Sequence, residues 1–332
     1  MFIAISDDLL YPSIMQVTIF DDRYGYDGRT PNERPLGSAE KAVIGLSEAL
    51  VERGHDVVVV NQTKEFAEIN GVTWLPWDST RPPSQDLMVA LRKPDLLQES
   101  EAEKYILWMW GGCKPLNNPG NRELLEEYKP ILIYVSEEQR RGWKPSITFE
   151  DHVIEPAIGS AFQELETGDQ APLPVAITTT HPVHGLQSII RMWTESIKPL
   201  CPGAELHVYS AGLAKAMETL EPDSKITAVY EDIVSAVGAG IHVKRPLPDS
   251  EMALIYCRSK VHLYPFISGD VYCGTLAESQ ASGLPAVVNT DGGQAGAASV
   301  RVRNGQTGYL APDESAFINL THEILHENSD IY

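Results

Sequence analysis

The chain has 332 residues, of which 43% are apolar, and this length is enough for two globular domains of about 150 residues each. Its 26 basic and 46 acidic residues give a formal net charge of −20, which argues against nucleic acid or an anionic membrane surface as a partner. No apolar run reaches the roughly 18 residues that a membrane helix needs, and the N-terminus lacks the basic flank of a signal peptide. We therefore expect a cytoplasmic protein without an integral membrane segment.

The cysteines are scattered along the chain, and no two form a CxxC pair. This spacing argues against a zinc site and, without a secretory signal, against a disulfide framework. We expect no metal site, and reduced thiols at Cys113, Cys201, Cys257 and Cys273.

The first half of the chain is predicted to alternate strands and helices. A strand is expected at residues 2–6, followed by a long polar loop through Pro35. A helix is then expected between Ser38, a good N-cap, and Gly54, a good C-terminal stop. Its apolar residues share one helical face: Ala42, Val43, Leu46, Ala49 and Leu50.

Three apolar runs in this half predict strands. Residues 57–60 are all valine, a pattern typical of a strand buried on both faces of a parallel sheet. Residues 105–110 and 130–135 predict further strands. A helix followed directly by such a strand is the pattern of a doubly wound α/β domain.

The second half repeats this alternation. We expect strands at residues 175–180, 206–210, 241–244, 261–266 and 286–290. The helices are a segment with Leu186, Ile189, Ile190, Trp193 and Ile197 on one face, a helix capped by Asp249 or Ser250, a helix through Glu278, and a last helix at residues 316–325. The tryptophans Trp108, Trp110 and Trp193 are expected in the core.

A polar stretch rich in Gly and Pro separates the halves. It predicts a linker at residues 161–174 between an N-terminal domain, 1–160, and a C-terminal domain, 175–332. The fold class is therefore α/β, with two Rossmann-like doubly wound domains facing across a cleft.

Five segments in this order resemble the GT4-like family of retaining GT-B glycosyltransferases. They are LGSAEKAVIGLSEALVERGHDVVVV, VIEPAIGSAF, THPVHGLQSIIRMW, LYPFISGDVYCGTLAESQASGLPAVVNTDGG and NGQTGYLAP. The resemblance extends over nearly the whole chain. It implies the GT-B fold, in which the C-terminal domain binds a nucleotide-sugar donor and the N-terminal domain binds the acceptor.

The fourth segment resembles the donor-binding core of the family. A diphosphate suits a helix N-terminus, where unpaired N–H groups and the helix dipole favour an anion, and Gly274 and Thr275 could supply such groups. Glu278 can accept two hydroxyl hydrogen bonds, which suits a ribose diol. By resemblance, Asp270 is the first acid of a pair spaced eight residues apart and approaches the donor sugar. Paired acids also occur on solvated helix faces, and this alternative stays open.

Further donor contacts are implied by the resemblance. Gly37 and Ser38 would meet the donor phosphates from the N-terminal domain, although they could also form an ordinary loop and helix cap. Asp291, Gly292 and Gly293 would close the floor beside the donor, or merely form a turn.

The chain departs from the family where relatives carry an Arg and a Lys that neutralise the departing diphosphate. Here His181 and His184 occupy that loop, and an unperturbed histidine is mostly neutral at pH 7. Lys244 or Arg245 could replace the missing cations, and the two histidines could also simply pack or cap the helix. Relatives often have a histidine after the strand at residues 105–110, where this chain has Trp110, Gly111 and Gly112.

The resemblance implies an enzyme: a metal-independent retaining glycosyltransferase that moves a sugar from a nucleotide-diphosphate-sugar to an acceptor hydroxyl without a cofactor. A UDP- or GDP-sugar is the expected donor. Asp270, Glu278 and His184 are the expected catalytic residues. His181, Lys244 and Arg245 join Gly37, Ser38, Gly274, Thr275 and Glu278 in donor binding. Two alternatives remain open: a catalytically degenerate GT-B protein that binds a nucleotide or sugar, and another enzyme on this architecture, such as a sugar-nucleotide epimerase. The sequence leaves the acceptor, for which residues 25–35 are the expected region, and the oligomeric state open.

Overall fold

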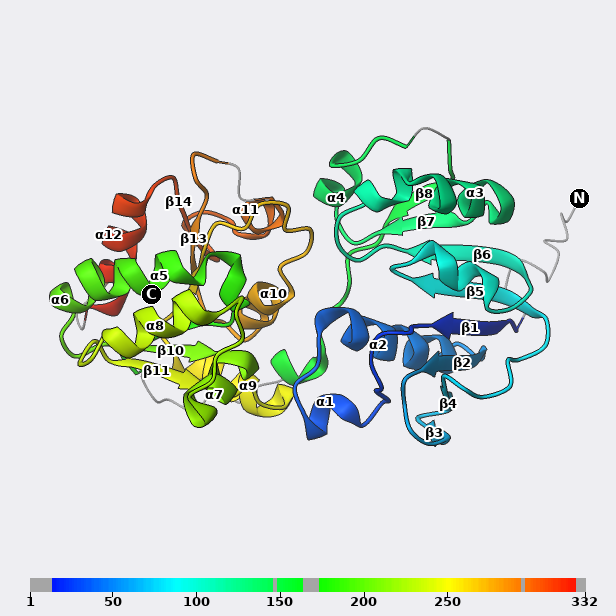
Figure 1. The fold of residues 1–332 in the computed structure, drawn as a ribbon, viewed down its shortest axis with the longest axis horizontal. Helices are drawn as coiled ribbons and strands as arrows, with labels where there is room; N and C mark the ends of the chain where they lie inside the picture. Colours follow the sequence, from blue (N-terminus) through cyan, green and yellow to red (C-terminus); the bar gives the residue numbers. More distant parts are fainter. Residues whose placement is uncertain (1–13, 146–147, 164–172, 294–295, 327–332) are drawn as a thin grey trace, which may run out of the picture. The chain divides into compact units, whose positions relative to one another are not determined.

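The computed structural model describes residues 14–145, 148–163, 173–293 and 296–326. The chain separates into two compact units, one of Met1–Thr30 with Ala39–Pro156 and the other of Pro31–Ser38 with Ala157–Tyr332. Each unit contains one β-sheet flanked by helices (Figure 1). The strand predicted at residues 2–6 and part of the predicted linker, 164–172, lie outside the described residues. The exact domain limits, 1–160 and 175–332, stay a prediction.

The first unit has an eight-stranded sheet in the order β3-β4-β2-β1-β5-β6-β7-β8. All neighbours pair in parallel except β3 and β4. The strands are β1 Gln16–Phe20, β2 Asp56–Asn61, β3 Ala67–Ile69, β4 Val72–Pro76, β5 Gln85–Leu91, β6 Ala102–Trp108, β7 Ile131–Tyr134 and β8 Asp151–Val153. The strands predicted at 57–60, 105–110 and 130–135 are thereby confirmed.

The loop predicted through Pro35 is wrong at two places. Gln16–Phe20 forms β1, a strand that pairs with both β2 and β5, and Thr30–Glu33 forms the short helix α1. Four of the five residues of β1 are buried, although the strand is short and two aspartates follow it directly. Its partners on both sides supply the burial, and those partners are distant in the sequence.

The helices of the first unit are α2 Ser38–Glu52, whose first residue groups with the second unit, η2 Pro94–Gln98, η3 Lys114–Asn117, α3 Pro119–Tyr128 and α4 Glu137–Arg141. Helix α2 and its end at Gly54, where φ is +88°, were predicted. Its buried face was predicted only in part, because Val43 is buried but Leu46 is not. Leu46 is exposed, and the buried residues are Ala39, Glu40, Val43, Ile44 and Ser47. The buried face includes Glu40, whose carboxylate is paired with the guanidinium of Arg92.

The second unit has a six-stranded sheet, parallel throughout, in the order β11-β10-β9-β12-β13-β14. The strands are β9 Val175–Thr178, β10 Glu205–Tyr209, β11 Ile241–Lys244, β12 Val261–Tyr264, β13 Ala286–Asn289 and β14 Gly308–Ala311. The first five were predicted. The last was not, and it begins at Gly308, where an added Cβ would lie 2.4 Å from the Ala286 carbonyl oxygen.

Helices cover both faces of this second sheet. They are η4 Ser160–Phe162, η5 Pro182–Leu186, α5 Gln187–Met192, η6 Trp193–Ile197, α6 Lys198–Leu200, α7 Ala211–Thr219, α8 Thr227–Ser235, α9 Asp249–Arg258, α10 Gly274–Ala281, α11 Ala297–Arg301 and α12 Glu314–Leu325. The predicted cap of α9 is wrong: the residue before the helix is Pro248, and Asp249 lies within the first turn.

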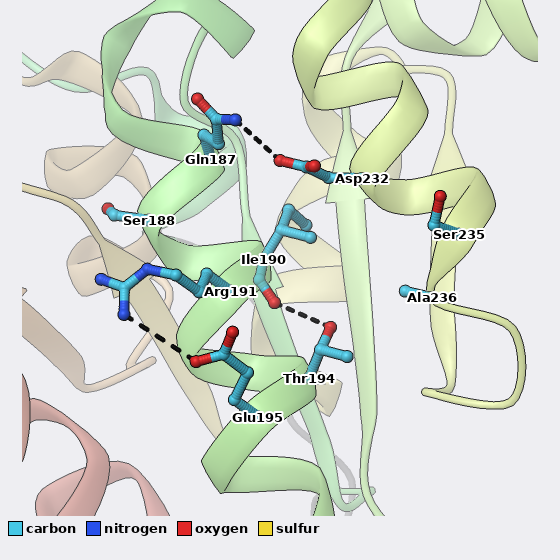
Figure 2. Close-up of a pocket in the computed structure, with 9 residues that line it drawn as sticks. All are labelled: Gln187, Ser188, Ile190, Arg191, Thr194, Glu195, Asp232, Ser235 and Ala236. Atoms are coloured by element: carbon cyan, nitrogen blue, oxygen red, sulfur yellow. Dashed lines mark hydrogen bonds and ion pairs between the residues drawn. The ribbon is translucent and has the colours of Figure 1, made fainter.

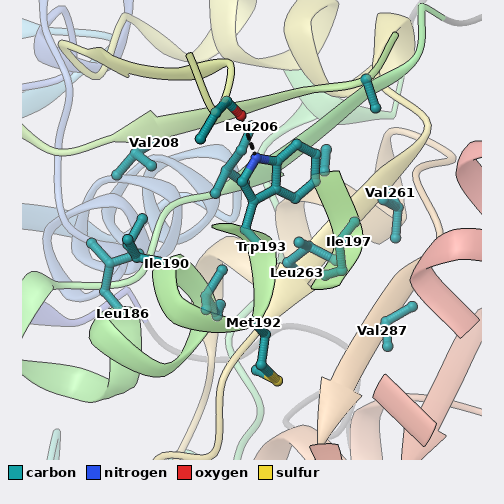
Figure 3. Close-up of a cluster of buried hydrophobic side chains, with 14 of the residues drawn as sticks. Leu186, Ile190, Met192, Trp193, Ile197, Leu206, Val208, Val261, Leu263 and Val287 are labelled. Atoms are coloured by element: carbon teal, nitrogen blue, oxygen red, sulfur yellow. Dashed lines mark hydrogen bonds between the residues drawn. The ribbon is translucent and has the colours of Figure 1, made fainter. Parts of the chain in front are cut away.

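The apolar face predicted for residues 186–197 is confirmed. Figure 3 shows Leu186, Ile190, Trp193 and Ile197 in one cluster with strand residues such as Leu206 and Leu263. The Trp193 Nε1–H donates to the Ala239 carbonyl oxygen at 2.8 Å, so this buried indole is satisfied. Side chains of α9, α10 and α11 pack on the opposite face of the sheet.

Two further expectations can be compared with the structure. Trp108 and Trp193 are buried, as predicted, whereas Trp110 is only partly buried. All four cysteines are free thiols. In the part of the chain that the structure describes, no helix is both long and apolar enough to cross a bilayer.

Candidate functional site

The carboxyl edge of the second sheet has a topological switch point between β9 and β12. From β9 the chain proceeds outward to β10 and β11, and then returns to the other side of β9 for β12 and β13. The loops after β9 and β12 therefore leave the sheet in opposite directions, which creates a crevice where parallel α/β sheets commonly bind ligands. Six residues predicted for the donor site lie in these two loops or in the helix after the second: His181, His184, Asp270, Gly274, Thr275 and Glu278.

The loop after β12 is organised around the Asp270 carboxylate. Its Oδ1 accepts hydrogen bonds from the backbone N–H groups of Tyr272 and Cys273, at 3.2 and 3.1 Å, and its Oδ2 accepts one from the Tyr264 hydroxyl. Burial and the Asp270 charge raise the pKa of Tyr264, so this hydroxyl stays a donor. Asp270 thus fixes the backbone that leads into α10, and its approach to a donor sugar stays a prediction.

Helix α10 starts at Gly274, directly after Cys273 in the left-handed region at φ +49°. This arrangement leaves the first N–H groups of the helix, including that of Thr275, at the carboxyl edge of the sheet. Ser38, which groups with the second unit, lies so close that a Cβ added to Gly274 would be 1.9 Å from its Oγ. Two residues that were predicted separately as phosphate contacts are therefore neighbours, and Gly37 beside them is exposed.

Glu278 lies one turn further along α10 and is buried, with 6% of its surface exposed. It is close to the Tyr256 hydroxyl, whose pKa is raised well above its ordinary value by burial and then by the Glu278 charge. The Tyr256 hydroxyl is also hydrogen-bonded to Thr179, at the end of β9. Glu278 is thereby connected to the loop that follows β9, although its binding of a ribose stays a prediction.

A buried histidine continues this chain of hydrogen bonds. His262 Nε2 lies 3.2 Å from Thr179 Oγ1, and its Nδ1 lies 2.8 Å from Ser279 Oγ. Because Ser279 donates its proton to the Leu276 carbonyl oxygen, Oγ accepts from Nδ1–H, and Nε2 in turn accepts from Thr179. Burial lowers the pKa of His262 to about 3, so this imidazole is neutral.

The two predicted histidines of the loop after β9 lie side by side on the surface. Their ring centroids are 5.3 Å apart, and His181 Nδ1 accepts the Val183 N–H at 3.4 Å. Burial, followed by the charges of His184 and Lys225, lowers the pKa of His181. His181 is therefore mostly neutral at pH 7, which favours hydrogen bonding over charge at this position. The loop closes at Gly185, where φ is +78° and a Cβ would lie 2.9 Å from the Pro265 side chain.

The remaining predicted residues lie away from the switch point or at its margin. Arg245 forms a two-pronged ion pair with Glu218 of α7, and Lys244 ends β11, the edge strand of the sheet. Donor binding by Lys244 and Arg245 stays a prediction, and the Arg245 guanidinium is paired with the Glu218 carboxylate. Asp291, Gly292 and Gly293 follow β13 with three successive positive φ values, which is a turn that exposes all three residues.

Two further arginines lie near these edges and were not predicted from the sequence. Arg92 follows β5 at the switch point of the first sheet, in the left-handed region at φ +71°, and pairs with two buried carboxylates, Asp21 and Glu40. Arg301 ends α11 in the second unit, where its guanidinium lies over the ring of Tyr272. A non-glycine residue with positive φ leaves no sequence signal, and Arg301 stands in a segment with no recognisable motif, so neither could be found from the sequence.

A groove of about 610 Å³ lies elsewhere, between α5–η6 and α8 on the helical layer of the second unit (Figure 2). Its polar side chains satisfy one another: Gln187 donates to Asp232 at 2.8 Å, and Arg191 lies 4.0 Å from Glu195. It offers no convergent reactive groups. Among the residues that the structure describes, no group of three or more His, Cys, Asp or Glu side chains could hold a metal ion.

No protein-family model and no curated protein matches this sequence. Solved structures do match over almost the whole chain. Sucrose-phosphate synthase from Thermosynechococcus elongatus is 13% identical with a TM-score of 0.63, over 94% of this chain and 90% of that one. The UDP-forming α,α-trehalose-phosphate synthase from Burkholderia vietnamiensis is 11% identical with a TM-score of 0.66, over 96% and 92%. HepE from Anabaena, solved with UDP and glucose, is 11% identical with a TM-score of 0.65, over 94% and 90%.

These structures define the class of fold. The chain is a two-unit α/β protein with the GT-B fold, as the sequence analysis predicted. At identities of 11 to 13% the likeness establishes this fold and leaves the activity to be argued from the site.

Proposed function

We propose that this protein is a glycosyltransferase that transfers a sugar from a nucleotide-diphosphate-sugar donor to an acceptor hydroxyl, in the manner of GT4-like retaining enzymes. The observation that carries the proposal is the convergence of Gly274, Glu278 and the loop after β9 at one switch point. The N-terminus of α10 suits a diphosphate, and a buried carboxylate one turn later suits hydroxyl groups. The solved structures of the same fold include a UDP-forming synthase and a protein in complex with UDP and glucose.

The proposed reaction needs neither a metal nor an organic cofactor. The acceptor hydroxyl attacks the anomeric carbon on the face from which the diphosphate departs, and a diphosphate oxygen takes the hydroxyl proton. The configuration at the anomeric carbon is retained. The protein contributes positioning and electrostatic stabilisation of the departing diphosphate. We further propose that residues 25–35 help to select the acceptor, and that the protein acts in the cytoplasm.

A thermal-shift screen of the purified protein against UDP-, GDP-, ADP- and CDP-sugars tests the donor. A ligand present at about 100 times its Kd should add roughly 3 kcal/mol to the stability, which raises Tm by several degrees. We expect one nucleotide family, most simply UDP or GDP, to give this response. If no nucleotide changes Tm, the proposal is wrong.

The role of Glu278 can be tested separately with the nucleotide that binds. The variant Glu278→Gln should weaken binding by about 10- to 100-fold, since a hydrogen bond to a charged group contributes about 1.5–3 kcal/mol. The same variant should bind the 2′,3′-dideoxy nucleotide as weakly as the wild type does, because the ribose hydroxyls are then missing in both cases. Glu251→Gln, on an exposed acid of α9, is the matched control. Equal losses for the ribose and dideoxy forms would contradict the assignment.

A second function, a GT-B protein that binds its ligand without turnover, is favoured by two observations. His181 has a lowered pKa, and Arg245 is paired with Glu218, so neither supplies a free cation for the departing diphosphate. This alternative predicts that the responding nucleotide-sugar binds, while neither transfer to a panel of acceptors nor slow hydrolysis of the donor is detected. Transfer or hydrolysis would exclude it.

A further inference from the structure

Helix α11 is fixed against the loop that precedes α10. The Ala297 N–H donates to the Asp270 carbonyl oxygen at 3.2 Å, and a Cβ added to Gly296 would lie 2.8 Å from that same oxygen. The first turn of α11 and the Asp270 loop therefore share one backbone junction. Arg301, the last residue of this short helix, is carried by an element that is held at the carboxyl end of β12.

The Arg301 guanidinium is directed toward that loop. Its Cζ lies 5.0 Å from the ring centroid of Tyr272, a cation–π contact. The positive charge of Arg301 also lowers the pKa of Tyr264, which burial and Asp270 raise. Tyr264 and Tyr272 flank Asp270 and precede Gly274, so the guanidinium lies beside the residues that lead into α10.

Arg301 lacks a hydrogen-bond partner at Nε and a carboxylate partner for its guanidinium among the described residues. Its Nε is buried without a hydrogen-bond partner, and within the described part of the chain its guanidinium forms no ion pair with a carboxylate. This is unexpected in a chain with 46 acidic residues and 26 basic ones, in which arginines such as Arg92, Arg191 and Arg245 are each paired. A guanidinium that no carboxylate neutralises can take an anionic ligand as its partner.

We propose that Arg301, oriented by Tyr272, binds a phosphate group of the donor nucleotide and supplies the cation that the loop after β9 lacks. The inference rests on the proposed function, and it names the residue that supplies a positive charge to the donor diphosphate. A guanidinium presents a planar fork of donors that matches phosphate oxygens, and it stays charged at every working pH. Neither property belongs to His181 or His184.

Isothermal titration of the purified protein tests the proposal, with UDP and GDP as probes and with uridine and guanosine as phosphate-free counterparts. In Arg301→Met the side chain can still pack on Tyr272 but loses its charge, and in Arg301→Lys the charge is kept without the fork. Arg303→Met is the matched control, because Arg303 is an exposed arginine two residues further on.

Whichever diphosphate binds the wild type, we expect Arg301→Met to lower its affinity by about 10- to 100-fold. The affinity for the corresponding nucleoside should not change. The affinity of Arg301→Lys for the diphosphate should lie between those of Arg301→Met and the wild type. Arg303→Met should bind the diphosphate with the same affinity as the wild type. If Arg301→Met does not fold, as judged by circular dichroism, Arg301→Gln replaces it.

Three results would overturn the inference, and they differ in what they mean for the proposed function. Unchanged diphosphate affinity in Arg301→Met overturns the inference alone. Equal weakening of nucleoside and diphosphate also overturns it alone, because the residue then acts through the fold. If the wild type binds neither UDP nor GDP, and no other nucleotide raises its Tm, the proposed function fails and the inference fails with it.

Discussion

At the scale of single residues, surroundings decide the charge of the basic side chains at the carboxyl edge of the second sheet. His262 is fully buried between two hydroxyl groups, and burial lowers its pKa to about 3. His181 lies on the surface, where partial burial and then the charges of His184 and Lys225 lower its pKa. The Arg301 guanidinium lies over the ring of Tyr272. The sequence singled out His181 as a candidate and gave no reason to consider His262.

Because the pKa of His262 is lowered, we expect the free energy of unfolding to decrease in acid. As the pH falls below about 6.5, the unfolded chain takes up a proton at this imidazole while the folded chain does not, so the free energy of unfolding decreases. Between pH 7 and pH 5 this residue should account for about 2 kcal/mol of the decrease. Urea unfolding of His262→Gln should therefore show a stability deficit at pH 7 that narrows by this amount at pH 5.

The control for this experiment is His152→Gln, a substitution on a mostly exposed side chain of β8. Its pH dependence of stability should follow that of the wild type. A constant difference between His262→Gln and the wild type from pH 7 to pH 5 would show that His262 titrates in the folded protein.

At the scale of elements, one largely buried arginine connects the start of α2 to the carboxyl ends of two strands in the first unit. Arg92 follows β5, Asp21 follows β1, and Glu40 lies in the first turn of α2. Arg92 Nη1 donates to Asp21 Oδ1 at 2.6 Å and Nη2 donates to Glu40, while the Tyr26 hydroxyl donates to Asp21 at 2.9 Å. This network explains why the polar Glu40 belongs to the buried face of an otherwise amphipathic helix.

Removal of this guanidinium should be strongly destabilising. The variant Arg92→Met leaves two buried carboxylates without their cation, and breaking a buried pair in this way costs about 3–5 kcal/mol. Lys93→Met is the matched control, since Lys93 pairs with Asp22 on the surface and exposed pairs contribute about 0–1 kcal/mol. Urea unfolding measures both. Similar values for the two variants would mean that solvent reaches the Arg92 network.

At the scale of the whole molecule, the formal charge of −20 predicts self-repulsion that salt should relieve. Raising NaCl from 10 to 150 mM shortens the Debye length from about 30 to about 8 Å, so distant carboxylates stop repelling one another. We expect Tm to rise by about 1–4 °C at pH 7.5. Near pH 5, close to the isoelectric point of about 4.8, the same salt step should have little effect. An equal rise in Tm at both pH values would mean that salting-out, and not relief of charge repulsion, causes the effect.

Several features were determined by the sequence alone, because local patterns encode them. The valine run of β2, the five apolar positions between Leu186 and Ile197, and the glycine stop of α2 were all predicted from neighbouring residues. The order of motifs along the chain predicted the GT-B fold, which the solved structures confirm.

Other features were decided only by the tertiary structure, because they depend on residues far apart in the chain. Strand β1 is buried by partners at residues 56–60 and 87–90, and Glu40 is buried by Arg92, 52 positions away. The same holds for Thr179 and His262, 83 positions apart, and for Arg301, whose place beside Tyr272 depends on how α11 packs on the Asp270 loop. Charge and hydrogen-bond partners at a site are set by packing, and packing between distant segments leaves no periodic trace in the sequence.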